Sequence, residues 1–100
     1  MIDWSRIAGF DWDAGNERKS ADKHGVSKLE AEQVFFNRPL LVVADDKHSV
    51  DERRFHALGH TDGGRFLMAT FTLRSDQTLL RVISVRQMSR KERLYYEQHS

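Results

Sequence analysis

Residues 65–85 read RFLMATFTLRSDQTLLRVISV, and they give the strongest indication of the fold. It holds two runs rich in apolar and β-branched residues, Arg65–Leu73 and Leu79–Val85, separated by Ser75-Asp76-Gln77. Such runs favour strands, and the polar residues between them are typical of a turn. Because a short connection joins strands that run in opposite directions, the stretch predicts two neighbouring antiparallel strands.

Two further strands are expected before this pair. Leu40–Ala44 is a short apolar run that ends at two aspartates, and Arg53–Leu58 is bounded by Gly59. Thr61-Asp62-Gly63-Gly64 is a strong turn signal that leads into the third strand. All the connections are short, so the four strands are predicted to form an antiparallel meander.

Two helices are expected ahead of the strands. The first is predicted to start near Asp13 and to end at His24, because acidic residues come early, basic residues come late, and Gly25 follows as a C-terminal cap. The second begins after Ser27, where a capping box lets a serine hydroxyl and a glutamate carboxylate satisfy free backbone donors. It is expected to end near Phe36, shortly before a proline.

A third helix is expected at the C-terminus. Ser89-Arg90-Lys91-Glu92 repeats the capping-box pattern and opens a helix through Tyr95 and Tyr96. The two tyrosines are adjacent, so one is expected in the core and the other partly exposed. The predicted architecture is an α+β fold with two N-terminal helices, a four-stranded antiparallel meander and a C-terminal helix packed on the sheet.

Composition narrows the class of protein. One hundred residues predict a single domain over residues 1–100, and the absence of cysteine excludes disulfides and thiolate metal sites. Residues 1–15 contain three aspartates and no apolar run typical of a signal peptide. No stretch approaches the roughly 20 apolar residues of a membrane helix. We therefore expect a soluble cytoplasmic protein that does not contact the membrane.

Charge is unevenly spread although the formal net charge is only +1. Residues 1–64 carry 9 basic and 12 acidic side chains, whereas residues 65–100 carry 7 basic and 3 acidic ones. A basic segment supplies most non-specific affinity for nucleic acid, but it can also be an ordinary solvated helix face. Both interpretations stay open for the five cationic residues Arg81, Arg86, Arg90, Lys91 and Arg93.

Arginines on the predicted strands are candidate phosphate ligands. Alternation along the fourth strand places Arg81 and Arg86 on opposite faces. Both faces of this strand are mostly apolar, which indicates a central strand with Arg86 leaving its end. There a guanidinium can hold a phosphate with two hydrogen bonds, or it can pair with a carboxylate of the first helix. Arg53 and Arg54 are neighbours, so at most one of them shares the face of Arg86.

Acid–base chemistry has two candidate residues. Glu52 can act as a general base or simply neutralise an arginine, and His24 can transfer a proton or serve as a cation at its helix end. The histidines lack the helical spacing of a zinc site, so no metal is expected. No serine-hydrolase elbow and no glycine-rich phosphate loop is present. The histidines are His24, His48, His56, His60 and His99.

An ordered set of motifs resembles the BrnT toxin family from about Phe10 to Glu97. The pieces fall in the family's order and close to its spacing, although Asn16, Ser20 and a longer turn at 75–78 depart from its pattern. They are Phe10-Asp-Trp12-Asp13, Lys23-His24-Gly25-Val26-Ser27, Phe36 with Pro39, Arg54 with Leu58-Gly59, Gly64-Arg65, Arg81-Val-Ile-Ser84-Val-Arg86, and Glu92-Arg93 with Tyr96.

The resemblance implies a function and a partner. It implies a fold related to RelE-type ribonucleases and a type II toxin that cleaves RNA without a metal or other cofactor, which inhibits translation and growth. It also implies a BrnA-like antitoxin with a ribbon-helix-helix part, and contact with operator DNA only through the antitoxin complex. An alternative is an inactive family member that serves as an antitoxin-binding, co-repressing module. Sequence-specific DNA binding by this chain itself is weaker, because its short helices lack helix-turn-helix spacing.

Residue roles follow from the same resemblance. Matching the family pattern singles out Lys23, His24, Arg54, Arg81, Arg86, Glu92, Arg93 and Tyr96. We expect Arg54 and Arg86 to bind the scissile phosphate, and Glu52 or His24 to deprotonate the attacking 2′-hydroxyl of the RNA. The residues expected to contact RNA elsewhere are Lys23, Arg81, Arg90, Arg93 and Tyr96.

Overall fold

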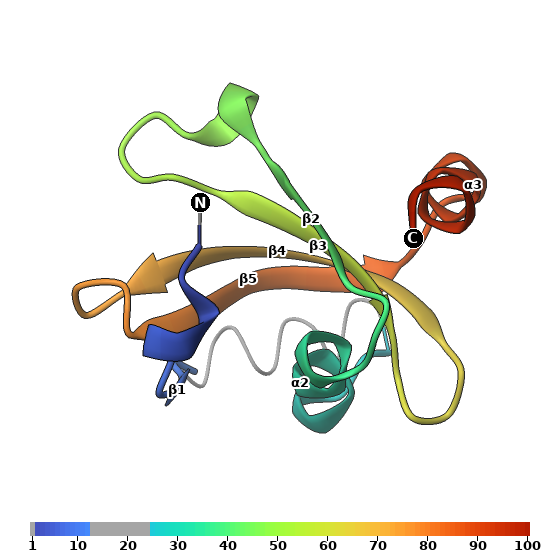
Figure 1. Cartoon of the computed structure of the whole chain (residues 1–100), viewed down its shortest axis with the longest axis horizontal. Helices are drawn as coiled ribbons and strands as arrows, with labels where there is room; N and C mark the ends of the chain where they lie inside the picture. The colour runs from blue at the N-terminus through green and yellow to red at the C-terminus, as the bar shows by residue number, and fades with distance from the viewer. Residues whose placement is uncertain (1, 13–24) are drawn as a thin grey trace.

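A computed structural model of the chain describes residues 2–12 and 25–100. A single sheet carries helix α2 on one face, and helix α3 lies on the other side at one end of the sheet (Figure 1). The elements are the 3₁₀ turn η1 (Trp4–Arg6), β1 (Gly9–Phe10), α2 (Lys28–Phe36), β2 (Leu41–Ala44), the 3₁₀ turn η2 (Asp46–His48), β3 (Phe55–His60), β4 (Phe66–Arg74), β5 (Leu79–Gln87) and α3 (Arg90–His99).

The sheet has the strand order β1-β5-β4-β3-β2. The α+β class is confirmed, and strands β2 to β5 form an antiparallel meander. The expected strand count was wrong, because β1 adds a fifth strand that runs parallel to β5, with Gly9 opposite Leu79. A strand of two residues has no periodicity that a sequence can reveal. The helix predicted from Asp13 to His24 lies outside the described residues.

Both predicted capping boxes are present. The Glu30 backbone N–H donates to Ser27 Oγ at 3.1 Å, and the Ser27 N–H donates to the Glu30 carboxylate at 3.2 Å. At α3 the corresponding distances between Glu92 and Ser89 are 3.1 and 2.8 Å. The helices begin where these caps place them. Neither α2 nor α3 has the length and apolar character that crossing a membrane requires.

The core lies between α2 and the sheet. Phe35 of α2 meets Phe71 of β4 edge to face, with ring centroids 5.2 Å apart. Gly59 is inside β3 rather than at its end, which corrects the expected boundary. A Cβ atom at Gly59 would lie 3.0 Å from the Cγ1 atom and the backbone oxygen of Val34. The glycine therefore lets the helix approach the sheet closely, and the strand continues to His60.

A β-bulge in β5 changes which of its residues share a face. Thr70 lies opposite Ser84 while Phe71 lies opposite Val82, so Ile83 has no opposite residue in β4. Leu80, Val82 and Val85 consequently all enter the core beneath α2. Arg81 and Arg86 therefore both point away from α2, whereas strict alternation had predicted opposite faces. The physical reason is the extra residue, which shifts the alternation by one.

Candidate functional site

The face of the sheet opposite α2 carries three of the predicted site residues, Arg54, Arg81 and Arg86. We call it the open face, because α3 covers only its end around Leu58, Met68 and Tyr96. The pairing of β3, β4 and β5 assigns the members of the open face. They are Arg54, His56, Thr70, Thr72, Arg81, Ser84 and Arg86.

Arg54 is the member of the open face with an unsatisfied buried atom. Its Nε is shielded from solvent and has no hydrogen-bond partner among the described residues. The neighbouring Arg53 points to the other face and holds its guanidinium carbon 5.7 Å from the centre of the Phe55 ring. A buried donor without an acceptor is destabilising and is rare in folded proteins. No acceptor for this Nε is present within residues 2–12 and 25–100.

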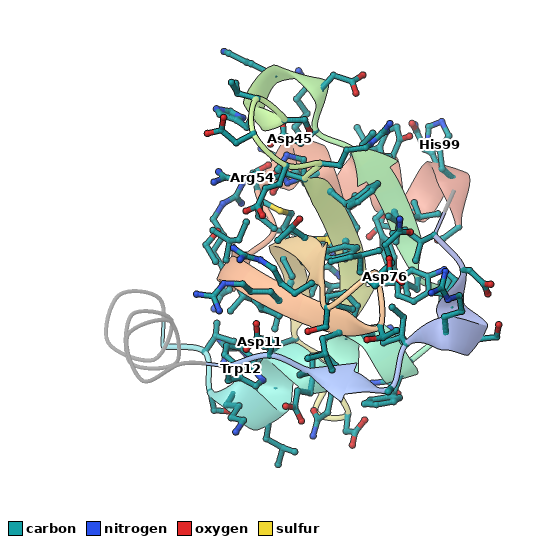
Figure 2. All side chains as sticks on the ribbon, turned by 90° about the vertical axis from the view of Figure 1, so that its left-hand side faces the viewer. Asp11, Trp12, Asp45, Arg54, Asp76 and His99 are labelled. Carbon is teal, nitrogen blue, oxygen red and sulfur yellow. The ribbon has the colours of Figure 1, made fainter. Side chains whose placement is uncertain are left out.

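The loop before β3 is tied to Arg54 by main-chain and serine hydrogen bonds. The Asp45 N–H donates to the Arg54 carbonyl oxygen at 2.8 Å, and the Arg54 N–H donates to Ser49 Oγ at 2.9 Å. The Ser49 hydroxyl in turn donates to the Asp45 carbonyl oxygen at 2.5 Å. Asp45 and Arg54 accordingly lie close together at the end of the sheet (Figure 2). These bonds fix η2 relative to the backbone of Arg54.

Asp45 has a buried carboxylate that contacts the imidazole rings of two histidines. His48 Nδ1 lies 3.0 Å and His56 Nε2 lies 3.1 Å from Asp45 Oδ2. Burial by itself raises the pKa of Asp45, but the hydrogen bond from His48 and the charges of both histidines outweigh it, so the pKa is lowered. His56 Nδ1 also lies 3.0 Å from Thr70 Oγ1. The carboxylate thus stays ionised and orients both rings.

One pocket combines predicted and unpredicted site residues. It has a volume of about 260 Å³, and we call it the Arg54 pocket. The predicted base Glu52 lines it together with Arg54, and Glu52 Oε1 lies 3.4 Å from Arg74 Nη2. Sequence reasoning missed His48 and Asp45, although their spacing of three residues was a usable signal. The pocket is lined by Lys47, His48, Val50, Asp51, Glu52 and Arg54.

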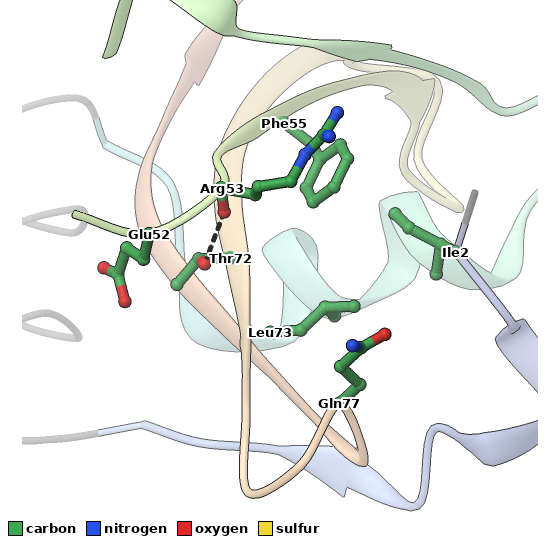
Figure 3. A pocket seen from close by; sticks show the side chains of 7 residues that line it. All are labelled: Ile2, Glu52, Arg53, Phe55, Thr72, Leu73 and Gln77. Carbon is green, nitrogen blue, oxygen red and sulfur yellow. Dashed lines mark hydrogen bonds between the residues drawn. The ribbon is translucent and has the colours of Figure 1, made fainter. Parts of the chain in front are cut away.

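A larger hollow of about 490 Å³ lies beside Glu52 (Figure 3). Glu52 and Arg53 line it together with Thr72, whose hydroxyl donates to the Arg53 carbonyl oxygen at 2.6 Å. Its other lining residues are Ile2, Phe55, Leu73 and Gln77, so none of the histidines that the structure describes faces it. Glu52 therefore stands between two hollows, of which only the Arg54 pocket offers an imidazole and an arginine without a partner among the described residues.

Arg86 is held by a carboxylate rather than left free. Its Nη1 and Nη2 atoms donate to the two Glu92 oxygens at 2.7 and 2.8 Å. This hydrogen-bonded pair lowers the pKa of Glu92 and raises that of Arg86, against the opposing effect of burial on each group. The sequence left open a phosphate or an ion pair with the first helix. The described partner is instead Glu92 of α3.

The other arginines predicted to contact RNA differ in their partners and exposure. Arg81 Nη1 lies 3.5 Å from Asp11 Oδ2. Arg93 donates to Glu97 at 3.1 Å, and its guanidinium carbon lies 4.0 Å from the centre of the Phe66 ring. Arg90 is exposed at the start of α3. These cations extend from the open face onto α3.

Tyr96 does not fit the predicted RNA contact. Its side chain is 4% exposed, and its hydroxyl donates to the Pro39 carbonyl oxygen. Burial also raises the pKa of the phenol. The exposed member of the pair is Tyr95, whose ring stacks on His99. Tyr96 faces the sheet because its ring fills the space beside Phe66.

Two predicted residues, Lys23 and His24, lie outside the described residues. Within residues 2–12 and 25–100, no group of three or more histidine, cysteine, aspartate or glutamate side chains is placed to hold a metal ion.

Comparisons with known proteins identify the family. Residues 12–92 match the family model described as the ribonuclease toxin BrnT of type II toxin–antitoxin systems. Among solved structures, the 1.1 Å crystal structure of the ribonuclease toxin BrnT from Brucella abortus is similar in fold, with a TM-score of 0.61 and 24% sequence identity. The match covers 82% of this chain and 97% of that one. No curated protein matches the chain.

The family match spans most of the chain and confirms the resemblance seen in its motifs. A type II toxin implies an antitoxin as partner and RNA as target. The chain belongs to the BrnT family of ribonuclease toxins of type II toxin–antitoxin systems.

Proposed function

We propose that this chain is a metal-independent endoribonuclease whose reaction takes place in the Arg54 pocket. The observation that carries the proposal is the shielded Nε of Arg54, which has no acceptor among the described residues. A phosphate oxygen is the acceptor that a guanidinium binds best, and RNA supplies one at every nucleotide. Family membership supports RNA as the substrate.

The chemistry uses the RNA's own 2′-hydroxyl as the attacking group. Glu52 accepts the proton of that hydroxyl, and the freed oxygen attacks the neighbouring phosphorus. Arg54 stabilises the negative charge that develops on the non-bridging oxygens. His24 stays an alternative base by resemblance. The reaction needs no metal, because proton transfer activates the attacking oxygen and a guanidinium neutralises the phosphate.

Arg86 receives a revised role in this proposal. Glu92 occupies both of its terminal nitrogens, so Arg86 anchors α3 to the sheet and adds little net charge for a phosphate. Arg81, Arg90 and Arg93, with Lys23, contact the RNA on either side of the cleaved bond. These cations contribute non-specific electrostatic affinity for RNA, which weakens as the salt concentration increases.

The biological setting is proposed from the family. We infer a BrnA-like ribbon-helix-helix antitoxin that covers the toxin, and operator DNA bound only through the antitoxin complex. Released toxin cleaves message in the cytoplasm and thereby inhibits translation and growth. Kinship with RelE-type ribonucleases belongs to the same proposal. Type II membership supports the antitoxin and the RNA target.

The test is RNA cleavage by the purified chain in buffer that contains a chelator. Wild-type protein is expected to cleave, and Arg54→Ala is expected to lose about 10²- to 10³-fold in rate, as when one charge-stabilising donor is removed. Arg53→Ala is the matched control, since Arg53 points to the other face and lies over Phe55. Equal losses in both variants would contradict the proposed site.

An inactive, antitoxin-binding family member is the second candidate. Asn16 and Ser20, which depart from the family pattern, favour it. This candidate predicts a tight complex with the antitoxin but no growth arrest and no loss of RNA. Cleavage by the wild-type chain that Arg54→Ala abolishes would exclude it.

A further inference from the structure

The Arg54 pocket contains a histidine to which no role has been given so far. His48 belongs to η2, and its side chain is 59% exposed. Its Nδ1 lies 3.1 and 3.0 Å from the two oxygens of Asp45. Because the lowered pKa of Asp45 keeps that carboxylate ionised, it can only accept, so Nδ1 carries the hydrogen. The ring nitrogen of His48 that does not contact Asp45 is therefore Nε2.

His48 is also held in place relative to Arg54. The same Asp45 that orients the ring donates its own N–H to the Arg54 carbonyl oxygen, and the His48 N–H lies 3.3 Å from Asp45 Oδ1. The next residue of the loop is Ser49, and its Oγ atom accepts a hydrogen bond from the Arg54 N–H. An imidazole and a guanidinium thus line one pocket on a hydrogen-bonded frame.

The other described histidines lack this combination. His56 has both ring nitrogens engaged, one by Asp45 and one by Thr70. His60 faces the Tyr96 hydroxyl at 3.4 Å, and His99 stacks on Tyr95 near the C-terminus. Among the histidines that the structure describes, His48 alone pairs an oriented Nδ1 with a place in the Arg54 pocket.

We propose that His48 is the general acid of RNA cleavage, and this inference rests on the proposed function. Glu52 takes the proton of the 2′-hydroxyl, and the 2′-oxygen forms its bond to phosphorus. The bond from phosphorus to the 5′-oxygen breaks, and that oxygen takes the proton from Nε2 of the His48 imidazolium. The products are a 2′,3′-cyclic phosphate and a 5′-hydroxyl. Solvent then returns a proton to His48 and removes one from Glu52.

The pocket offers the right number of groups for this reaction. A base, an acid and a cation for the phosphate come from Glu52, His48 and Arg54, and Lys47 adds a second cation at the rim. A volume of about 260 Å³ is large enough for a phosphodiester group. General acid–base pairs of this kind act without a metal.

A substrate with a sulfur leaving group tests the role of His48. In this RNA the 5′-bridging oxygen at the scissile bond is replaced by sulfur, which leaves as a thiolate and needs no proton. His48→Ala is expected to be about 10²- to 10⁴-fold slower than wild type on the ordinary linkage, and to match wild type on the sulfur linkage. Glu52→Gln should be slow on both, since the sulfur does not replace a base.

His56→Ala is the matched control, because it removes the other imidazole from the same Asp45. Any loss in this variant should be equal on both linkages. Equal deficits of His48→Ala on both linkages, or no deficit at all, would overturn the general-acid role while wild-type cleavage still supports the proposed function. No cleavage of either linkage by wild type would overturn both proposals together.

Discussion

Replacing Arg54 by methionine should make the protein more stable and less active at the same time. The shielded Nε has no acceptor among the described residues, and an unsatisfied buried donor costs about 1–3 kcal/mol. Only one of the five guanidinium hydrogens is buried without an acceptor, so we expect removal of Arg54 to stabilise the fold by about 1 kcal/mol, the lower end of this range. Methionine keeps most of the apolar stem that packs on the sheet. For a domain of this length, the melting temperature should rise by about 4–8 °C.

The comparison variant is Arg86→Met, which removes the two hydrogen bonds that Arg86 donates to the Glu92 carboxylate at 2.7 and 2.8 Å. Charge-assisted bonds contribute about 1.5–3 kcal/mol, and partial exposure reduces this to about 1–2 kcal/mol. The melting temperature measured by calorimetry should therefore rise for Arg54→Met and fall for Arg86→Met. A fall of similar size in both variants would contradict this prediction, because it would show that Arg54 Nε has a hydrogen-bond partner in the folded protein.

Three further predictions concern packing, pH and salt. Gly59→Ala should lower the free energy of unfolding by about 1–3 kcal/mol in urea titrations, because the new Cβ meets Val34 at 3.0 Å, whereas Gly63→Ala should change it by less than about 0.5 kcal/mol. The lowered pKa of Glu92 means that its contribution is complete above its ordinary value of 4.5 and is lost as pH falls through the folded value. Stability of the wild type should thus decline on acidification more steeply than that of Glu92→Gln, measured by denaturant midpoints from pH 6 to about 3. Binding of RNA by an Arg90→Ala variant should show a shallower dependence on salt concentration than wild type, reduced by about one phosphate contact in filter-binding titrations.

The sequence predicted those elements whose signals are local. Capping boxes at Ser27 and Ser89 depend on residues three apart, and both helices start where expected. The meander followed from short apolar runs and short turns. Strand β1 was not predicted, because two residues carry no pattern and because its pairing with β5 joins segments about seventy residues apart. The bulge at Ile83 was not predicted either, since it depends on the register in which β5 pairs with β4.

The candidate site was predictable only in part for a related reason. Glu52 and Arg54 were named because their chemistry is visible in the residue types. His48 acquires its role only through Asp45, which in the sequence marks no more than the end of an apolar run, and through a pocket that tertiary contacts create. Tyr96 was named because it matches the family pattern, but its exposure depends on how α3 packs against β3 and β4.

The most direct test of attack by the RNA's own 2′-hydroxyl replaces this hydroxyl at the cleaved nucleotide. Wild-type protein is incubated, in buffer with a chelator, with an RNA oligonucleotide and with its copy carrying a single 2′-deoxy substitution at the mapped cleavage site. We expect a 2′,3′-cyclic phosphate end from the first oligonucleotide and no cleavage at that site in the second. Cleavage of the deoxy-substituted oligonucleotide at the same site, or dependence of cleavage on added divalent metal, would contradict this mechanism.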